Sequence, residues 1–378
     1  MLGGVESIIA AQCRTLASLG LDVRLVTGDC ASWPGAAATQ IPLLDPRHPE
    51  VMRARGAARL PAASHPVVAR LTDDLRRAVD GCSQVWVHNA FTVSLNPILT
   101  RALHVLASES GSHWVAWCED LSSASIYARG PDISTLPYVE VVTISSERSR
   151  QLVSRFRLPV EPKVIEPPVD PVFWLGMSDR TVALCSELNL FGVQLLVLVP
   201  AKLLPHKNLA LAVELARGLR SQLESVVVLL TGPASPHEPE LSDRVRAGLD
   251  EQIARFSLQS HVRFLTDLVG EAPDLKIVRD LMMLADLVFI PSREEGFSLP
   301  LREAALLRVP VMCLDLPTFN EALGDSVHYV SASASGNDLA QVALDAAPER
   351  GNSRRRRILQ SDVRFRRGIA GIVGLRID

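Results

Sequence analysis

The sequence lacks several features that mark large classes of protein. No apolar run reaches the roughly 18 residues that a membrane-spanning helix needs, and the first residues have neither the basic region nor the apolar core of a secretory signal. There is no Gly-x-Gly-x-x-Gly and no Walker A sequence, which argues against a dehydrogenase or a kinase. The net charge of −3 gives no electrostatic case for a nucleic-acid partner. We therefore expect a cytoplasmic protein that binds no nucleic acid.

Cysteine patterns that indicate disulfides or metal sites are also missing. The six cysteines form no C-x-x-C pair, and several lie in apolar runs. We expect them to be reduced and mostly buried.

What is present is a globular composition with a regular alternation of elements. The chain has 378 residues, 47% of them hydrophobic and 21% charged, which favours two α/β domains over one core. Apolar runs predict strands at 23–27, 85–88, 114–118, 139–144, 195–200, 226–230, 262–265, 287–290 and 311–314. Helical patterns lie between them, at about 5–19, 65–80, 94–107, from 146, and at 208–221, 238–256, 274–285, 300–307 and 336–346. This alternation predicts two doubly wound parallel sheets, with a ligand at the carboxyl ends of their strands.

Proline punctuation predicts the domain boundary. Four prolyl dipeptides interrupt regular structure between residues 157 and 175. We expect an N-terminal Rossmann-like domain at 1–165, a second domain at 172–350 and a terminal helix at 352–375. One feature does not fit, because Gly3-Gly4 stand where a first βα turn belongs, with no strand before them. A missing first strand would leave the middle of that sheet unpaired.

The most informative segment follows the expected strand at 287–290 and reads Glu-Glu-Gly-Phe-Ser-Leu-Pro-Leu-Arg-Glu-Ala from Glu294 to Ala304. Pro300 suits the first turn of a helix, whose free N–H groups can receive phosphate or sugar oxygens. Glu295 precedes this turn and Glu303 lies about one turn inside the helix. The two carboxylates can therefore accept hydrogen bonds from sugar hydroxyls. The alternative is a surface helix with two solvated acids.

A second polar segment, at 200–208, follows another buried strand and opens another helix. Lys202 and Lys207 are five residues apart across the strand-to-helix turn, so they could close on a diphosphate from two sides. Lysine is scarce in this chain, which makes two solvated surface lysines the weaker interpretation.

These two segments resemble retaining glycosyltransferases of family 4, also described as glycosyltransferase group 1, which have the two-domain GT-B fold. Glu295 and Glu303 look like the E-x7-E signature of that family. Lys207 matches the lysine of its "GRL-x-x-x-KG" phosphate clamp, and Lys202 stands where the family usually has arginine. The resemblance implies that Glu295 lies against the transferred sugar, that Glu303 binds the ribose, and that the lysines stabilise the leaving diphosphate.

Weaker similarities extend over most of the chain. Residues 307–311 look like the family's "cGvPVv" continuation, 164–170 like its hinge, 230–233 like a glycine turn of the donor domain, and 3–6 like its N-terminal "GG-x-E" loop. The donor-binding residues that the resemblance implies are Glu303, Gly296, Phe297, Ser298, Leu299, Gly232, Gly3 and Gly4.

The acceptor side departs from the family. After the strand at 114–118 the family often has a histidine that points into the cleft, and this chain has Glu119-Asp120. His88, at the end of its own strand, is a further acceptor-side candidate, although a lone histidine at a strand end is more often structural.

The resemblance implies transfer of a hexose from a UDP- or GDP-sugar to a glycan, lipid-linked or small-molecule acceptor. It implies no cofactor, and because the chain has no Asp-x-Asp pair we expect no metal. The arginines near the C-terminus either form a solvated helix face or contact the inner face of an anionic membrane peripherally. The alternative function is a non-catalytic or degraded GT-B protein that binds nucleotide sugars, which the missing strand and Glu119 would fit.

Overall fold

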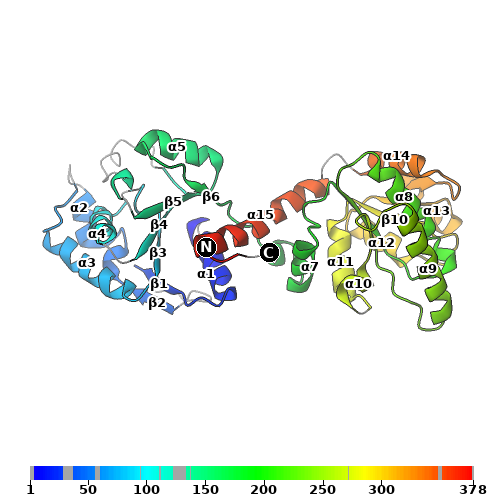
Figure 1. The fold of residues 1–378 in the computed structure, drawn as a ribbon, viewed down its shortest axis with the longest axis horizontal. Helices are drawn as coiled ribbons and strands as arrows, with labels where there is room; N and C mark the ends of the chain where they lie inside the picture. Colours follow the sequence, from blue (N-terminus) through cyan, green and yellow to red (C-terminus); the bar gives the residue numbers. More distant parts are fainter. Residues whose placement is uncertain are drawn as a thin grey trace. The chain divides into compact units, whose positions relative to one another are not determined.

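The computed structural model describes residues 4–28, 37–55, 60–93, 95–109, 112–121, 133–136, 138–270, 272–347 and 351–376. The chain forms two compact units (Figure 1). The first is Met1–Pro168 with Ser361–Asp378, and the second is Val169–Gln360. The boundary at Pro168 lies inside the proline-rich segment, between the expected limits at 165 and 172. Helix α15, Gly351–Ile372, contributes residues to both units.

The second unit is built on a six-stranded parallel sheet. Its strands are β7 (Leu195–Val199), β8 (Val226–Leu230), β9 (Val262–Phe264), β10 (Leu287–Ile290), β11 (Val311–Leu314) and β12 (His328–Val330). They pair in the order β12-β11-β10-β7-β8-β9. This is the order of a doubly wound dinucleotide-type fold, in which the direction of winding reverses between β7 and β10. The predicted α/β class with parallel sheets is confirmed.

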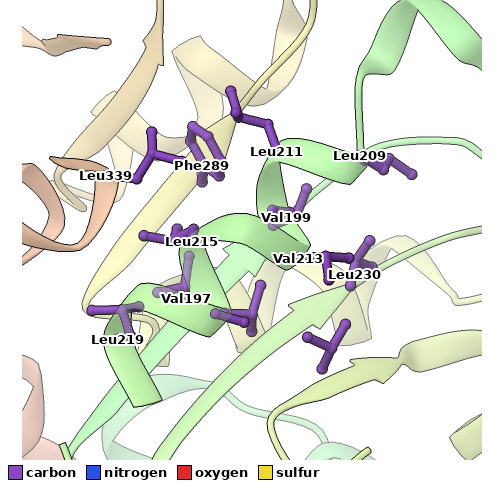
Figure 2. Packing of buried hydrophobic residues seen from close by; sticks show 14 of the residues in the cluster. Val197, Val199, Leu209, Leu211, Val213, Leu215, Leu219, Leu230, Phe289 and Leu339 are labelled. Atoms are coloured by element: carbon purple, nitrogen blue, oxygen red, sulfur yellow. The ribbon is translucent and has the colours of Figure 1, made fainter. Parts of the chain in front are cut away.

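Helices cover this sheet and bury it. They are α7 (Asp179–Glu187), α8 (Ala210–Arg220), α9 (Pro239–Arg255), α10 (Leu265–Val269), α11 (Leu275–Leu284), α12 (Leu299–Leu306), α13 (Pro317–Leu323) and α14 (Gly336–Ala346). Every residue of β7, β8, β10 and β11 is buried, as expected for parallel strands covered on both faces. Figure 2 shows part of the core, where leucines of α8 pack with Val197 and Val199 of β7 and with Phe289 of β10.

A buried arginine anchors the start of α15 in the second unit. Arg356 is fully buried and forms an ion pair with Asp286 at 2.7 Å. Its guanidinium also donates hydrogen bonds to the carbonyl oxygens of Leu284 and Val193. Because a buried charge without partners is costly, this network fixes the start of α15 beside the amino ends of β7 and β10.

The first unit contains two separate parallel sheets. Strands β3 (Gln84–His88), β4 (His113–Cys118), β5 (Val139–Thr143) and β6 (Lys163–Val164) form one, and β1 (Arg24–Thr27) and β2 (Ala37–Gln40) form the other. Within the described residues no backbone hydrogen bonds of a ladder join β1 to β3. In a doubly wound sheet the first strand lies between these two strands. Helices α1 (Gly4–Ser18), α2 (Pro49–Arg55), α3 (Pro66–Val79), α4 (Pro97–Ser108) and α5 (Ser146–Phe156) accompany the strands.

Most expected elements are present within one to three residues at each end. The elements that the sequence did not predict are short or weakly apolar: β2, β6, β12, α2, α6 (Pro171–Leu175), α7, α10 and α13. Strand β2 reads Ala-Ala-Thr-Gln, which carries almost no apolar signal. Such elements form because tertiary packing overrides local preference.

The described cysteines are free, and four of the five are buried. Burial raises the pKa of the Cys118 and Cys185 thiols to about 12, so both remain protonated at neutral pH. The expectation of buried thiols is confirmed for Cys13, Cys118, Cys185 and Cys313, whereas Cys82 is half-buried and Cys30 lies outside the described residues.

Two mid-helix glycines provide a test of the packing between α8 and α14. A Cβ atom on Gly218 of α8 would overlap the backbone of Gly336 at the start of α14, whereas a Cβ atom on Gly248 of α9 would meet nothing within 4 Å. We expect Gly218→Ala to lower the free energy of unfolding by about 2 kcal/mol or more, and Gly248→Ala to raise it by up to about 1 kcal/mol. Urea unfolding of both variants checks this, and equal effects of the two changes would contradict the described packing.

Candidate functional site

Two loops of the second unit meet where the winding of its sheet reverses. Strands β7 and β10 are hydrogen-bonded neighbours, with Leu287 opposite Val197 and Val288 opposite Leu198. Residues 200–208 follow the carboxyl end of β7, and residues 291–298 follow that of β10. In doubly wound sheets ligands bind at this point of reversal. Both segments selected from the sequence therefore lie at the expected ligand-binding edge.

The loop after β7 is held by the turn that follows β8. The Ala201 N–H donates to Thr231 Oγ1 at 3.0 Å, and the Gly232 N–H donates to the Ala201 carbonyl at 3.1 Å. Gly232 has a φ of 55°. A side chain there would press on the Phe264 ring, 3.1 Å from the position of its Cβ. Gly232 thus supports the loop that carries Lys202, which is itself exposed.

The same loop then forms the 3-10 helix η4, Pro205–Lys207, and ends at Asn208 with a φ of 52° before α8 begins. It is tied directly to the second loop, because the Arg293 N–H donates to the His206 carbonyl at 2.8 Å. This bond places Lys207 beside the loop that contains Glu295.

The central contact of the site is an ion pair between Lys207 and Glu295. Lys207 Nζ lies 2.6 Å from Glu295 Oε1, and the Ser292 hydroxyl donates to the same oxygen at 2.8 Å. The two charged side chains are only 19% and 14% exposed. The Glu295 carbonyl accepts a further hydrogen bond from Thr318 Oγ1 at 2.9 Å. Glu295 is therefore fixed by its side chain and its backbone, beside a cation that could bind an anionic ligand.

The donor-side candidates from Gly296 to Leu299 follow Glu295 directly in the chain. Ser298 has a φ of 54° and stands immediately before α12, and Pro300 is in the first turn of that helix. Gly296, Phe297 and Leu299 are exposed. The Arg302 guanidinium covers the Phe297 ring at 3.7 Å from its centroid and donates to the Phe297 carbonyl. This contact braces the loop at the start of the helix.

Glu303 is the fifth residue of α12 and is exposed. Along the chain, Glu295 precedes the first turn of α12 and Glu303 follows it. The two carboxylates thus stand on either side of a turn with free N–H groups, as the sequence predicted. The structure pairs Glu295 with Lys207, and Glu303 remains open to solvent.

In the first unit, the acceptor-side candidates form a buried polar cluster. His88 Nδ1 lies 2.5 Å from Glu119 Oε1, and His88 Nε2 lies 2.9 Å from Oε1 of Gln12 in α1. The His88 ring stacks on Trp117 with centroids 5.9 Å apart. Glu119 is 3% exposed and Gln12 is 2% exposed. His88 and Glu119 are thus partners at the carboxyl ends of adjacent strands. Gln12 was not predicted as a member of this cluster.

Asp120 is exposed and is positioned by its neighbour on the adjacent strand end. Asn89, with a φ of 58°, accepts hydrogen bonds on its Oδ1 from the N–H groups of Glu119 and Asp120, each at 2.9 Å. Gly4 is the first residue of α1, and Gly3 lies outside the described residues.

Sequence reasoning missed several residues that hold these sites, namely Ser292, Thr318, Asn208, Asn89 and Gln12. Asn89 and Asn208 could have been noticed, because asparagine after a strand or a short turn often adopts the left-handed conformation. Ser292 lies three residues before Glu295 in the same loop, whereas Thr318 and Gln12 are brought to their sites by tertiary structure.

Two further properties concern metals and membranes. Across the described ranges, no group of three or more His, Cys, Asp or Glu side chains is arranged to hold a metal ion. No helix in the same ranges is both long enough and apolar enough to cross a bilayer.

Two sequence comparisons relate this chain to known glycosyltransferases. Residues 186–358 match the sequence model of the family Glycosyl transferases group 1. This range contains both loops and α12. The chain is also similar to a protein named as the teichuronic acid biosynthesis glycosyltransferase TuaC of Bacillus subtilis, with 35% identity over 75 residues. That match spans 20% of this chain and 19% of TuaC. Residues 186–358 of the second unit are thus similar in sequence to group 1 glycosyltransferases.

The chain is also similar to solved structures of other proteins. A glycosyltransferase of Rickettsia africae is 15% identical, with 98% of this chain and 90% of that chain covered and a TM-score of 0.37. HepE of Anabaena in complex with UDP is 16% identical, with 98% and 95% covered and a TM-score of 0.37.

A double-mutant cycle tests the Lys207–Glu295 contact. Because both side chains are largely shielded from water, we expect Lys207→Met and Glu295→Gln to show a coupling energy of about 1–3 kcal/mol in urea unfolding. The exposed pair of Arg217 and Glu214 in α8 is the control, with an expected coupling below about 0.5 kcal/mol. Additive effects of the two changes at Lys207 and Glu295 would show that the ion pair does not form in solution.

Proposed function

We propose that the chain is a retaining GT-B glycosyltransferase that moves a hexose from a UDP- or GDP-sugar to a glycan, lipid-linked or small-molecule acceptor. The observation that carries the proposal is the Lys207–Glu295 pair at the reversal point of the sheet. It lies in the segment that matches the group 1 glycosyltransferase family. The donor is bound by the second unit, with its diphosphate near Lys207 and Lys202 and its ribose on Glu303.

The chemistry follows from charge. When the bond between the sugar carbon and the phosphate oxygen breaks, negative charge grows on the departing diphosphate. Lys207, Lys202 and the N-terminal turn of α12 stabilise that charge. The new bond forms between the sugar carbon and the acceptor oxygen, and the acceptor proton passes to the departing phosphate. This route needs no strong protein base. We propose that it also needs no metal and no other cofactor.

Glu295 is the group that lies against the transferred sugar in this proposal. In the ligand-free chain it is neutralised by Lys207 and held by Ser292. A diphosphate that draws Lys207 toward itself would leave Glu295 free to accept hydrogen bonds from sugar hydroxyls. The Gln12–His88–Glu119 cluster and Asp120 are the proposed acceptor side. Arg356 is buried, so contact with an anionic membrane is proposed only for exposed C-terminal arginines such as Arg357 and Arg367, and only for a lipid-linked acceptor.

Titration calorimetry with UDP and GDP, with and without EDTA, tests the donor site. We expect one nucleotide to bind equally well with and without EDTA. We expect Glu303→Ala to weaken that binding about tenfold or more, because a hydrogen bond to a charged group is lost. Glu251→Ala, which removes an exposed glutamate from α9, is the matched control and should bind as the wild type does.

Incubation with UDP-glucose or GDP-mannose separates an enzyme from a binding protein. Release of the nucleoside diphosphate supports catalysis. Tight binding with no release over hours would favour the non-catalytic alternative. Failure of the folded protein to bind either nucleotide would contradict the proposed donor site.

A further inference from the structure

Two buried polar atoms near the Lys207–Glu295 pair have no hydrogen-bond partner. They are Asn208 Nδ2 and Ser298 Oγ. In the described part of the second unit only one other side-chain atom, Arg356 Nε, is buried and unpaired in this way. Asn208 directly follows Lys207, and Ser298 is three residues after Glu295. Because buried polar atoms almost always have partners, two unpaired atoms in the loops that carry this ion pair call for an explanation, and contact with a ligand would supply one.

The backbone at these two positions would suit glycine. Asn208 and Ser298 have φ angles of 52° and 54°, in the left-handed region that glycine enters most easily. Glycine would also leave no polar atom unpaired. The chain nevertheless places a hydrogen-bonding side chain at both positions, and Ser298 is only 5% exposed.

The chemistry of the surrounding groups defines the ligand. An amide Nδ2 donates hydrogen bonds, and a serine hydroxyl can donate one. Lys202 and Lys207 add positive charge, and the loops lead into the N-termini of α8, of 11 residues, and α12, of 8 residues. Donors, cations and helix N-termini together select a ligand with several anionic oxygens, such as a diphosphate.

We infer that the side chains of Asn208 and Ser298 donate hydrogen bonds to the diphosphate of the bound nucleotide. This inference rests on the proposed function. It adds Asn208 to the donor-binding residues and gives Ser298, which was expected among them, a specific role for its side chain. Lys207 contributes charge, whereas Asn208 and Ser298 contribute directed hydrogen bonds from the ends of the two loops. These bonds form only with ligand, so the ligand-free chain leaves both atoms unpaired.

The test compares Asn208→Gly and Ser298→Ala with the wild type by calorimetry, with UDP, GDP and inorganic pyrophosphate as probes. Each change should weaken binding of the nucleotide that the wild type binds by about tenfold or more. Pyrophosphate affinity should fall in parallel, because it carries the phosphates without a base. The melting temperature of the ligand-free protein should stay the same or rise, since neither side chain loses a protein hydrogen bond.

Matched controls exist in the same unit. Asn189 and Ser257 have φ angles of 53° and 52°, and neither lies in the two loops of the site. Asn189→Gly and Ser257→Ala therefore repeat the same chemical changes in the same backbone conformation. Both should bind every probe as the wild type does.

The outcomes separate this inference from the proposed function. If the wild type binds a nucleotide and the two variants bind it equally well, the donor site stands and the inference is wrong. Loss of melting temperature with unchanged affinity would likewise overturn it, because the side chains would then be structural. Binding of pyrophosphate but of no nucleotide would contradict the proposed donor and overturn the inference for a nucleotide, even if the variants lost pyrophosphate binding. No binding of any probe by the wild type would overturn both.

Discussion

The site depends on the pairing of β7 with β10, two strands that are far apart in sequence and adjacent in the sheet. The pairing brings their carboxyl ends together, so that the two loops lie side by side and Lys207 meets Glu295 at 2.6 Å. Other contacts support the same point. The Thr231–Gly232 turn holds one loop, Thr318 holds the other, and the Arg293 N–H joins them. The helices that bury the sheet make this arrangement rigid, which a preorganised binding site requires.

In the first unit, too, polar residues meet at the carboxyl ends of two adjacent parallel strands. Strands β3 and β4 are adjacent, and their carboxyl ends carry His88 and Glu119, which are bonded to each other. Helix α1 adds Gln12, and Asn89 fixes the turn that presents Asp120. Where the family that the sequence resembles often has a histidine after β4, this chain has Glu119, and His88 ends the adjacent strand β3. The polar cluster is therefore present, although its composition differs from the pattern that the sequence resembles.

The sequence predicted much of the second unit because its central strands are uninterrupted apolar runs, and Val226–Leu230 is an example. Short elements such as β2 carry too little apolar signal to be read locally. At the site, the strand–loop–helix context was enough to select Glu295, Glu303 and Lys207. Their pairing was not predictable, because Lys207 and Glu295 are 88 residues apart and only the order of the strands joins them. The same holds for Gln12, which is 76 residues from His88.

The most direct test of the central claim is a crystal structure of the protein with the nucleoside diphosphate that it binds. The account predicts that the diphosphate lies at the carboxyl ends of β7 and β10, within hydrogen-bonding distance of Lys207, with the ribose on Glu303. Glu295 should then be free of Lys207 or share it with the ligand. A nucleotide bound elsewhere, with the Lys207–Glu295 pair unchanged and untouched, would contradict the account.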